Sequence, residues 1–412
     1  MKKLKDCDRA CPFWSSVAKE TFISDVRGAC TREIRYLWSH PWDLALISWV
    51  PAVALTMIWA IFSAGVNTKL PMALVDEDHS AESRHLAIAI DATRSTAVAA
   101  RPTSLDEAWS FARQRRVYAV LHIPHDWGRR AQRGDPLPIV LYTNEQFHAA
   151  GSSITTDVIG ALGSVAEGRA LASLATLGGG LVGAQRRADL VHAELRSLYG
   201  PQLSFERALT GAFLPTTLHL FVLGGAAFAI GREFRDRTAD RWLASARGNV
   251  YAALLGKLLP LLSCFALLAL TVIVWLAGYR GWTANGSLLA WYAGLVSLIL
   301  ACCAIPALLI GLTGTLRVAL AVCAITNITA ISFTGFTYPL YSMTTGAKIW
   351  SQLLPFHYFY EIQQQQWNAG APITRSLIPF AVLLGVFTIL PLAIALPRLE
   401  KRCRDPSEWG LR

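Results

Sequence analysis

The sequence predicts an α-helical polytopic membrane protein with six transmembrane helices and an inserted α/β extracytoplasmic domain. Of its 412 residues, 53% are hydrophobic and only 16% are charged, whereas soluble domains carry nearer to a quarter charged residues. A long polar stretch, residues 65–209, separates the first apolar run from the others. Each run is long enough to cross a bilayer as a helix. The six runs are 44–64, 211–230, 250–277, 287–313, 318–338 and 377–396.

The distribution of basic residues predicts the orientation of these spans. The formal net charge is +10, which in a soluble protein would suggest nucleic acid as a partner. Here Lys and Arg gather in residues 1–43, 232–257 and 398–412. With six spans these segments share one side, and cytoplasmic segments carry the excess of Lys and Arg. We therefore expect both termini in the cytoplasm and contact with membrane lipid, not nucleic acid.

The polar stretch has the pattern of an α/β unit with a mixed sheet. Ser104 and Glu107 form a capping box that opens a helix. A long helical pattern from residue 154 to 198 is broken at the glycines 178–180, which favour a kink or a break. None of the eight cysteines lies between residues 67 and 208, so an outer domain would fold without disulfides. Strands are expected at 70–75, 117–123 and 138–142, and helices at 81–91 and 104–114.

The sequence contains no catalytic motif that we can identify. Gly256-Lys257 is followed by Leu258 and lacks the earlier glycine of a phosphate-binding loop. Cys7 and Cys11 have no partners at zinc-ligand spacing. We therefore expect no catalytic residue, no metal site and no cofactor in this chain, and energy supplied by a separate subunit.

The segment between the second and third spans is amphipathic and charged. On pattern alone it is equally read as a basic loop that fixes topology. Its Arg232-Glu233, Thr238 and Gly-Lys-Leu-Leu-Pro at 256–260 resemble the coupling helix of ABC transporter permeases of the type 2 export class. Arg235 and Arg237 make it more basic than the family pattern. The resemblance implies a coupling helix at 232–247, with ATPase-coupling residues Arg232, Glu233, Thr238, Asp240 and Trp242.

Three further stretches carry the same resemblance. The approach to His40-Pro41 is similar to the interfacial helix of these permeases. Within the insertion, LPMALVDEDHS, SLDEA, YAVLHIPHDW and RGDPLPIVLYTNEQ occur in the order found in drug-exporter-like members. Residues 339–360 resemble the re-entrant outer gate helices, and Glu361 is equally read as an exposed residue of a surface helix. The implied gate residues are Pro339, Met343, Pro355, His357 and Glu361.

Polar residues inside spans are costly and mark candidate functional positions. In the family, the second and fifth spans line the dimer interface and the transport path. The alternative is hydrogen bonding between helices, worth roughly 1 kcal/mol or less for each bond, and it stays open for His219 and Asn327. The substrate-path candidates are Thr216, Thr217, His219, Thr326 and Asn327.

Together with the predicted topology, this resemblance implies the permease subunit of an ATP-driven ABC exporter in a bacterial inner membrane. It would move amphipathic small molecules or drugs outward, with ATP and Mg on a partner ATPase. Expected partners are that ATPase, a second identical or related permease, and a periplasmic adaptor protein. The alternatives are a lipid, glycan or peptide exporter, and a membrane receptor with an outer ligand-binding domain. The short tail after Leu396 argues against a receptor with a cytoplasmic signalling domain.

The resulting domain division has five parts. A cytoplasmic N-terminus with the interfacial helix covers residues 1–43, and the first transmembrane helix covers 44–64. The periplasmic α/β domain covers 65–209. Transmembrane helices two to six cover 210–397, and the cytoplasmic tail covers 398–412.

Overall fold

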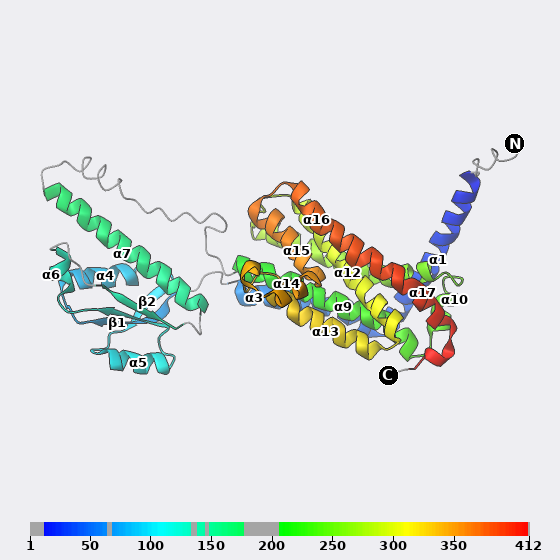
Figure 1. Ribbon diagram of the computed structural model, residues 1–412, viewed down its shortest axis with the longest axis horizontal. Coiled ribbons are helices and arrows are strands. Elements are labelled where there is room, and N and C mark those ends of the chain that lie inside the picture. The colour runs from blue at the N-terminus through cyan, green and yellow to red at the C-terminus, as the bar shows by residue number, and fades with distance from the viewer. Residues whose placement is uncertain (1–11, 64–67, 133–137, 145–147, 177–205, 411–412) are drawn as a thin grey trace. The chain divides into compact units, whose positions relative to one another are not determined.

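The computed structural model describes residues 12–63, 68–132, 138–144, 148–176 and 206–410. The chain divides into two compact units, shown in Figure 1. The helical unit comprises Met1–Ser63 and Glu206–Arg412, and the inserted unit comprises Ala64–Phe205. A mostly helical membrane protein with an inserted α/β unit is therefore confirmed as the fold class.

The inserted unit is built on a four-stranded mixed sheet in the order β2-β1-β3-β4. Strand β1 is parallel to both β2 and β3, whereas β4 is antiparallel to β3. Strand β2 was not predicted, because its sequence TAVAA is rich in alanine, a residue depleted in strands. The strands are β1 Leu70–Asp76, β2 Thr96–Ala100, β3 Ala119–Ile123 and β4 Val140–Thr143.

Helices cover both faces of this sheet (Figure 1). Met72 and Leu121 pack with residues of α4 and α7 on one face, and Ala73 and Val120 pack with α5 on the other. This alternation follows the two-residue period of a strand. The glycines at 178–180 lie outside the described residues. The helices are α4 Ala81–Asp91, α5 Leu105–Arg113, α6 Trp127–Gln132 and α7 His148–Thr176.

In the helical unit, the described residues include five helices that are long and apolar enough to cross a membrane, and a sixth if one bent pair counts as one span. Each predicted apolar run corresponds to one of them. The second predicted run lies in α9, and the last predicted run lies in α16, η7 and α17. The spans are α9 Gly211–Arg235, α11 Val250–Ile273 with η4 Val274–Tyr279, α12 Leu288–Thr313, α13 Leu316–Phe333, and α16 Ile373–Leu384 with η7 Gly385–Ile389 and α17 Leu390–Arg404.

The first span differs from the predicted uninterrupted helix. It consists of α2 Pro41–Ile47 and α3 Trp49–Phe62, bent by 40°. Pro51 has no backbone N–H, so it cannot donate to the carbonyl of Ile47 four residues earlier. The thiol of Cys264 on α11 donates a hydrogen bond to that carbonyl oxygen instead, with a distance of 2.9 Å between the sulfur and the oxygen. The bend is therefore a proline kink whose freed carbonyl is satisfied by a neighbouring helix.

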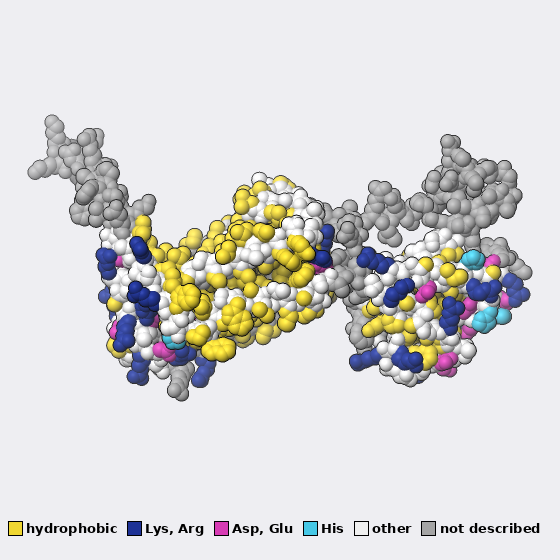
Figure 2. Space-filling view, turned by 180° about the vertical axis from the view of Figure 1, so that it is seen from behind, with side chains coloured by type: hydrophobic (Ala, Val, Ile, Leu, Met, Phe, Trp, Pro, Cys, Tyr) yellow, Lys and Arg dark blue, Asp and Glu magenta, His cyan; other side chains and the backbone are white. Residues whose placement is uncertain are grey.

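Short elements lie at the two ends of the helical unit. Helix α1, Pro12–Ser39, and helix α10, Ala239–Ala244, lie near one end, and α14 and α15 lie at the other (Figure 1). Basic side chains gather at the α10 end, and hydrophobic side chains cover the middle of the unit (Figure 2). The remaining short elements are η3 Glu206–Thr210, η5 Leu340–Ser342, α14 Thr345–Gln352, α15 Pro355–Gln363, η6 Gln364–Ala369 and η8 Pro406–Glu408.

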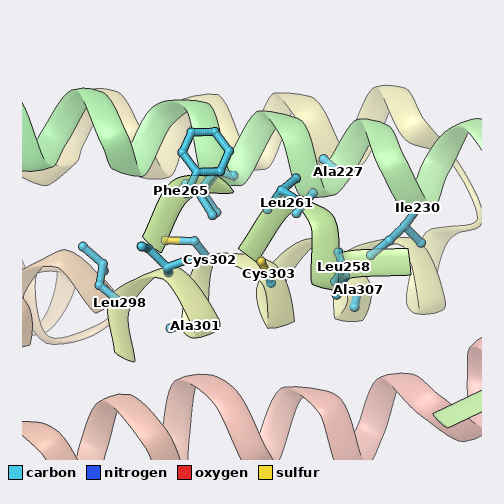
Figure 3. Packing of buried hydrophobic residues seen from close by; sticks show 14 of the residues in the cluster. Ala227, Ile230, Leu258, Leu261, Phe265, Leu298, Ala301, Cys302, Cys303 and Ala307 are labelled. Atoms are coloured by element: carbon cyan, nitrogen blue, oxygen red, sulfur yellow. The ribbon is translucent and has the colours of Figure 1, made fainter. Parts of the chain in front are cut away.

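The core of the helical unit forms where α9, α11 and α12 pack together (Figure 3). Ala227, Ala301 and Ala307 are fully buried there, and small residues let membrane helices approach closely. Leu261 and Phe265 of α11 fill the space between them. This packing sets the relative positions of the helices that carry the charged residues described next.

Candidate functional site

Five buried or half-buried charged residues meet at the α10 end of the helical unit. We call them the charge cluster: Arg32 and Glu33 of α1, Arg232 and Glu233 of α9, and Lys257 of α11. They come from three helices, and the α1 pair is separated from the α9 pair by about two hundred residues of sequence. Buried charges are stable only when they are paired, so the cluster links these helices.

Glu233 is the centre of the charge cluster. Its side chain is 3% exposed. Arg32 donates to both of its carboxylate oxygens, at 2.8 Å each, which is the bidentate geometry of a strong ion pair. Lys257 Nζ lies 2.5 Å from Oε1, and the Thr238 hydroxyl donates to Oε2 over 2.5 Å. Partial burial would lower the pKa of Arg32, but the hydrogen bond and the charge of Glu233 outweigh burial and raise it.

Arg232 turns toward the other carboxylate of the cluster. It pairs with Glu33, and its Nη1 lies 3.6 Å from Asp43 Oδ2. Its guanidinium stacks over the ring of Tyr36, 3.6 Å from the centroid, a favourable cation–π arrangement. Glu33 also accepts from Lys257 Nζ over 2.8 Å. Each carboxylate of the charge cluster is therefore shared by two cations.

Glycines let α1 come close to α11 and to the end of α10. A Cβ at Gly256 of α11 would lie 2.5 Å from the Val26 carbonyl oxygen and 2.6 Å from Ala29 Cβ on α1. A Cβ at Gly28 of α1 would lie 2.5 Å from the Ser245 carbonyl oxygen. Real Cβ atoms do not approach so closely, so side chains at these positions would push α1 away. The glycine preceding Lys257 is thus a packing residue.

The segment after α9 presents a charged surface directly beside the charge cluster. Helix α10 is held by Trp242, which is buried and donates its indole N–H to the Ala253 carbonyl over 3.1 Å. Arg247 ties the following loop to α1 through Asp25, at 3.0 Å. The remaining charged side chains point outward, and we call them the exposed rim: Arg235, Asp236, Arg237, Asp240 and Arg241.

The five residues expected to couple to an ATPase are thus divided between two environments. Arg232, Glu233 and Trp242 are buried within this chain, and Thr238 is half-buried against Glu233. Asp240 is exposed. Buried side chains cannot contact a partner surface, so those three do not form a contact with an ATPase directly, and their coupling role stays a prediction. The predicted helix at 232–247 is the end of α9 followed by the six-residue α10.

Two of the substrate-path candidates contact each other. His219 is 1% exposed, and its Nδ1 lies 2.8 Å from Asn327 Oδ1, joining α9 to α13. Thr216 and Thr326 donate to carbonyls of their own helices. Thr217 is half-buried on α9. The His219–Asn327 bond fits the alternative of a contact between helices, and the path role of these residues stays a prediction.

The gate candidates lie on the short elements at the opposite end. Pro339 precedes η5 and Met343 follows it, and Pro355 begins α15. His357 Nδ1 lies 3.0 Å from the Ser351 hydroxyl, and burial lowers the pKa of this histidine. Glu361 is exposed, as the surface-helix alternative requires, although partial burial still raises its pKa. Their role as a gate stays a prediction.

Sequence reasoning missed Glu33 and Asp43, which complete the surroundings of Arg232. One signal was present: the dipeptide Arg-Glu occurs both at 32–33 and at 232–233. The two copies exchange partners, since Arg32 pairs with Glu233 and Arg232 pairs with Glu33. A repeated dipeptide is too short to predict such an exchange without knowledge of the helix packing.

The comparisons with known proteins support this arrangement of spans. A family model described as ABC-2 family transporter protein matches residues 41–396, which includes all six predicted spans. Neither the curated proteins nor the solved structures contain a match to the chain. Family membership implies a membrane-embedded transport subunit that works with an ABC ATPase. The chain is therefore a multi-pass membrane protein that belongs to the ABC-2 family of transporters.

Proposed function

We propose that this chain is the permease subunit of an ATP-driven exporter that moves amphipathic small molecules or drugs out across a bacterial inner membrane. The observation that carries the proposal is the exposed rim, held on three membrane-associated helices by the charge cluster. The ATPase partner would bind ATP and Mg, because this chain has no phosphate-binding loop.

The coupling mechanism follows from the contacts of α9 and α10. An ATPase docks on the exposed rim, and its closure displaces α10. Trp242 and Glu233 transmit the displacement, because Trp242 holds α10 on α11 and Glu233 joins α9 to α1 and α11. Packed elements with paired charges move as a unit. The spans α9 and α11 therefore shift when the ATPase closes.

The orientation of the chain follows from the positive-inside rule. The α10 end and both termini face the cytoplasm, and the inserted α/β unit is periplasmic, where it meets an adaptor protein. A second permease, identical or related, completes the pore. The substrate path runs past α9 and α13, and α14 and α15 form the outer gate. Lipid, glycan or peptide substrates remain the alternative.

The exposed rim provides the test of the proposal. The chain is co-expressed with ABC ATPases of the same organism and purified in detergent, and nucleotide hydrolysis by any complex is measured. Asp240→Ala combined with Arg241→Ala should lower association, because both side chains are exposed on α10. Lys348→Ala combined with Arg375→Ala is the matched control, since these charges are exposed on the opposite end.

Three results would count against the proposal in different ways. Equal loss of association in both double variants would remove the docking role of the exposed rim. Unchanged association in both would do the same. A wild-type chain that binds no ABC ATPase would overturn the exporter itself.

A further inference from the structure

A crevice of about 290 Å³ opens beside the charge cluster within the helical unit. This volume is near the lower limit of small-molecule sites, which span roughly 300–1,000 Å³. Three of the residues that line the crevice are partly exposed: Leu46 at 46%, Leu220 at 44% and Leu320 at 37%. The crevice is thus reached through the apolar surface of the spans. Its apolar walls are Leu46, Leu220, Phe221, Phe228, Leu261 and Leu320.

One end of the crevice is polar and is lined by a buried arginine that has an unused hydrogen-bond donor. Arg232 lines the crevice and is 3% exposed. Its two terminal nitrogens reach Glu33 and Asp43, but its Nε has no hydrogen-bond partner among the residues that the structure describes. An unsatisfied buried donor is costly, so an acceptor atom at this end would be stabilising.

The charges lining the polar end are already balanced. Glu33 and Asp43 contribute two carboxylates, and Arg232 and Lys257 contribute two cations. Adding a full negative charge would leave one buried charge without a partner, which is strongly unfavourable. An uncharged head group that accepts a hydrogen bond fits this end better than a carboxylate does.

The wall of the crevice leaves space at one helical position. Gly224 and Gly225 of α9 both line it. A Cβ at Gly225 would lie 3.1 Å from Leu261 Cδ1, so this glycine packs against α11. A Cβ at Gly224 would have no heavy atom within 4 Å. The space before Gly224 is therefore open to a ligand, and a side chain that begins at this Cβ would enter the crevice.

We propose that the crevice binds an uncharged amphipath, with its hydrocarbon chain along the apolar walls and an oxygen of its head accepting from Arg232 Nε–H. The inference rests on the proposed permease function and narrows it, because it names the class of molecule that enters from the bilayer. The ligand lies against both α9 and the charge cluster, so its arrival touches the residues that position the exposed rim.

Photolabelling tests the proposal without any transport assay. The full chain is placed in lipid nanodiscs with a monoacylglycerol that carries a photoactivatable group in its chain, and labelled peptides are identified by mass spectrometry. Labelling is expected on the α2, α9 and α11 peptides that form the walls. Gly224→Leu should reduce it about tenfold, the effect of a binding penalty of about 1.4 kcal/mol.

Gly385→Leu is the matched control. Gly385 is also helical and half-buried in a span, and a Cβ there meets no heavy atom within 4 Å. Labelling of the crevice should persist in this variant. The photoactivatable fatty acid of the same chain length should label the crevice less than the monoacylglycerol, because its carboxylate adds an unbalanced charge.

Several outcomes would overturn the proposal. Equal labelling in the Gly224 and Gly385 variants would mean that the crevice is not the site. Stronger labelling by the fatty acid would refute the argument for an uncharged head. Labelling that is lost when two copies of the chain share a nanodisc, but present with a single copy, would show that a second permease fills the crevice. The ATPase is absent from the experiment, so failure to bind one would refute the exporter function without changing the labelling.

Discussion

Two adjacent parts of one charged segment lie in opposite environments. Arg232 and Glu233 are buried, whereas the exposed rim starts only two residues later at Arg235. Both parts are rich in Arg and acidic residues, so composition does not distinguish them. The difference is that α9 still packs against α1 and α11 at Glu233, and ends at Arg235. A charged segment next to a membrane span can thus be buried and ion-paired in one part and exposed in the next.

The largest effect that would test this distinction is expected at Glu233. Glu233→Ala removes the carboxylate that Arg32 and Lys257 share, and breaking a buried ion pair costs about 3–5 kcal/mol. We expect a large fall in the thermal unfolding temperature in detergent, with any loss of ATPase association following from misfolding. A variant as stable as the wild type would show that the buried pairs do not clamp the helices.

A smaller effect is expected where the segment passes from the interior to the surface. Thr238 donates its hydroxyl to Glu233 over 2.5 Å, and a hydrogen bond to a charged group contributes about 1.5–3 kcal/mol. Thr238→Val keeps the shape and removes the donor, so it should lower stability less than Glu233→Ala does. Thr238→Ser, which retains the hydroxyl, is the control. If Thr238→Ser were less stable than Thr238→Val, the effect would belong to the methyl group, which Val keeps and Ser lacks.

The smallest effect on stability is expected on the exposed rim. Asp236 is exposed and pairs only with its neighbour Arg235 at 2.7 Å among the described residues. Surface substitutions of this kind usually change stability by no more than about 0.5 kcal/mol. Asp236→Ala should therefore unfold at nearly the same temperature as the wild type. Destabilisation as large as that of Glu233→Ala would abolish the contrast between clamp and rim.

The inserted unit shows what local sequence determines. Ser104 and Glu107 predicted the start of α5, and the Glu107 N–H indeed donates to the Ser104 hydroxyl oxygen over 3.3 Å. Helix α4 begins and ends at the predicted residues. Capping and side-chain periodicity act over a few residues, so they can be read from the chain directly. Strand β2 was missed because it depends on its partner β1 and not on its own composition.

The membrane spans were predictable for the same reason, since hydrophobicity over about twenty residues is a local property. The proline kink at Ser48 was not expected, although Pro51 was visible, because many prolines in membrane helices are accommodated without a break. The partner of the freed Ile47 carbonyl is Cys264, more than two hundred residues away.

By itself, the sequence determined the class of the protein, its spans, most elements of the inserted unit and the family to which the pattern is similar. These properties follow from hydrophobicity, capping and motifs that operate along the chain. Only the tertiary structure decided that Glu33 completes the surroundings of Arg232, that Trp242 faces inward and that the crevice opens beside Gly224. The physical reason is that burial and ion pairing depend on which helices pack together, and close packing across α1, α9 and α11 brings together residues that no local pattern connects.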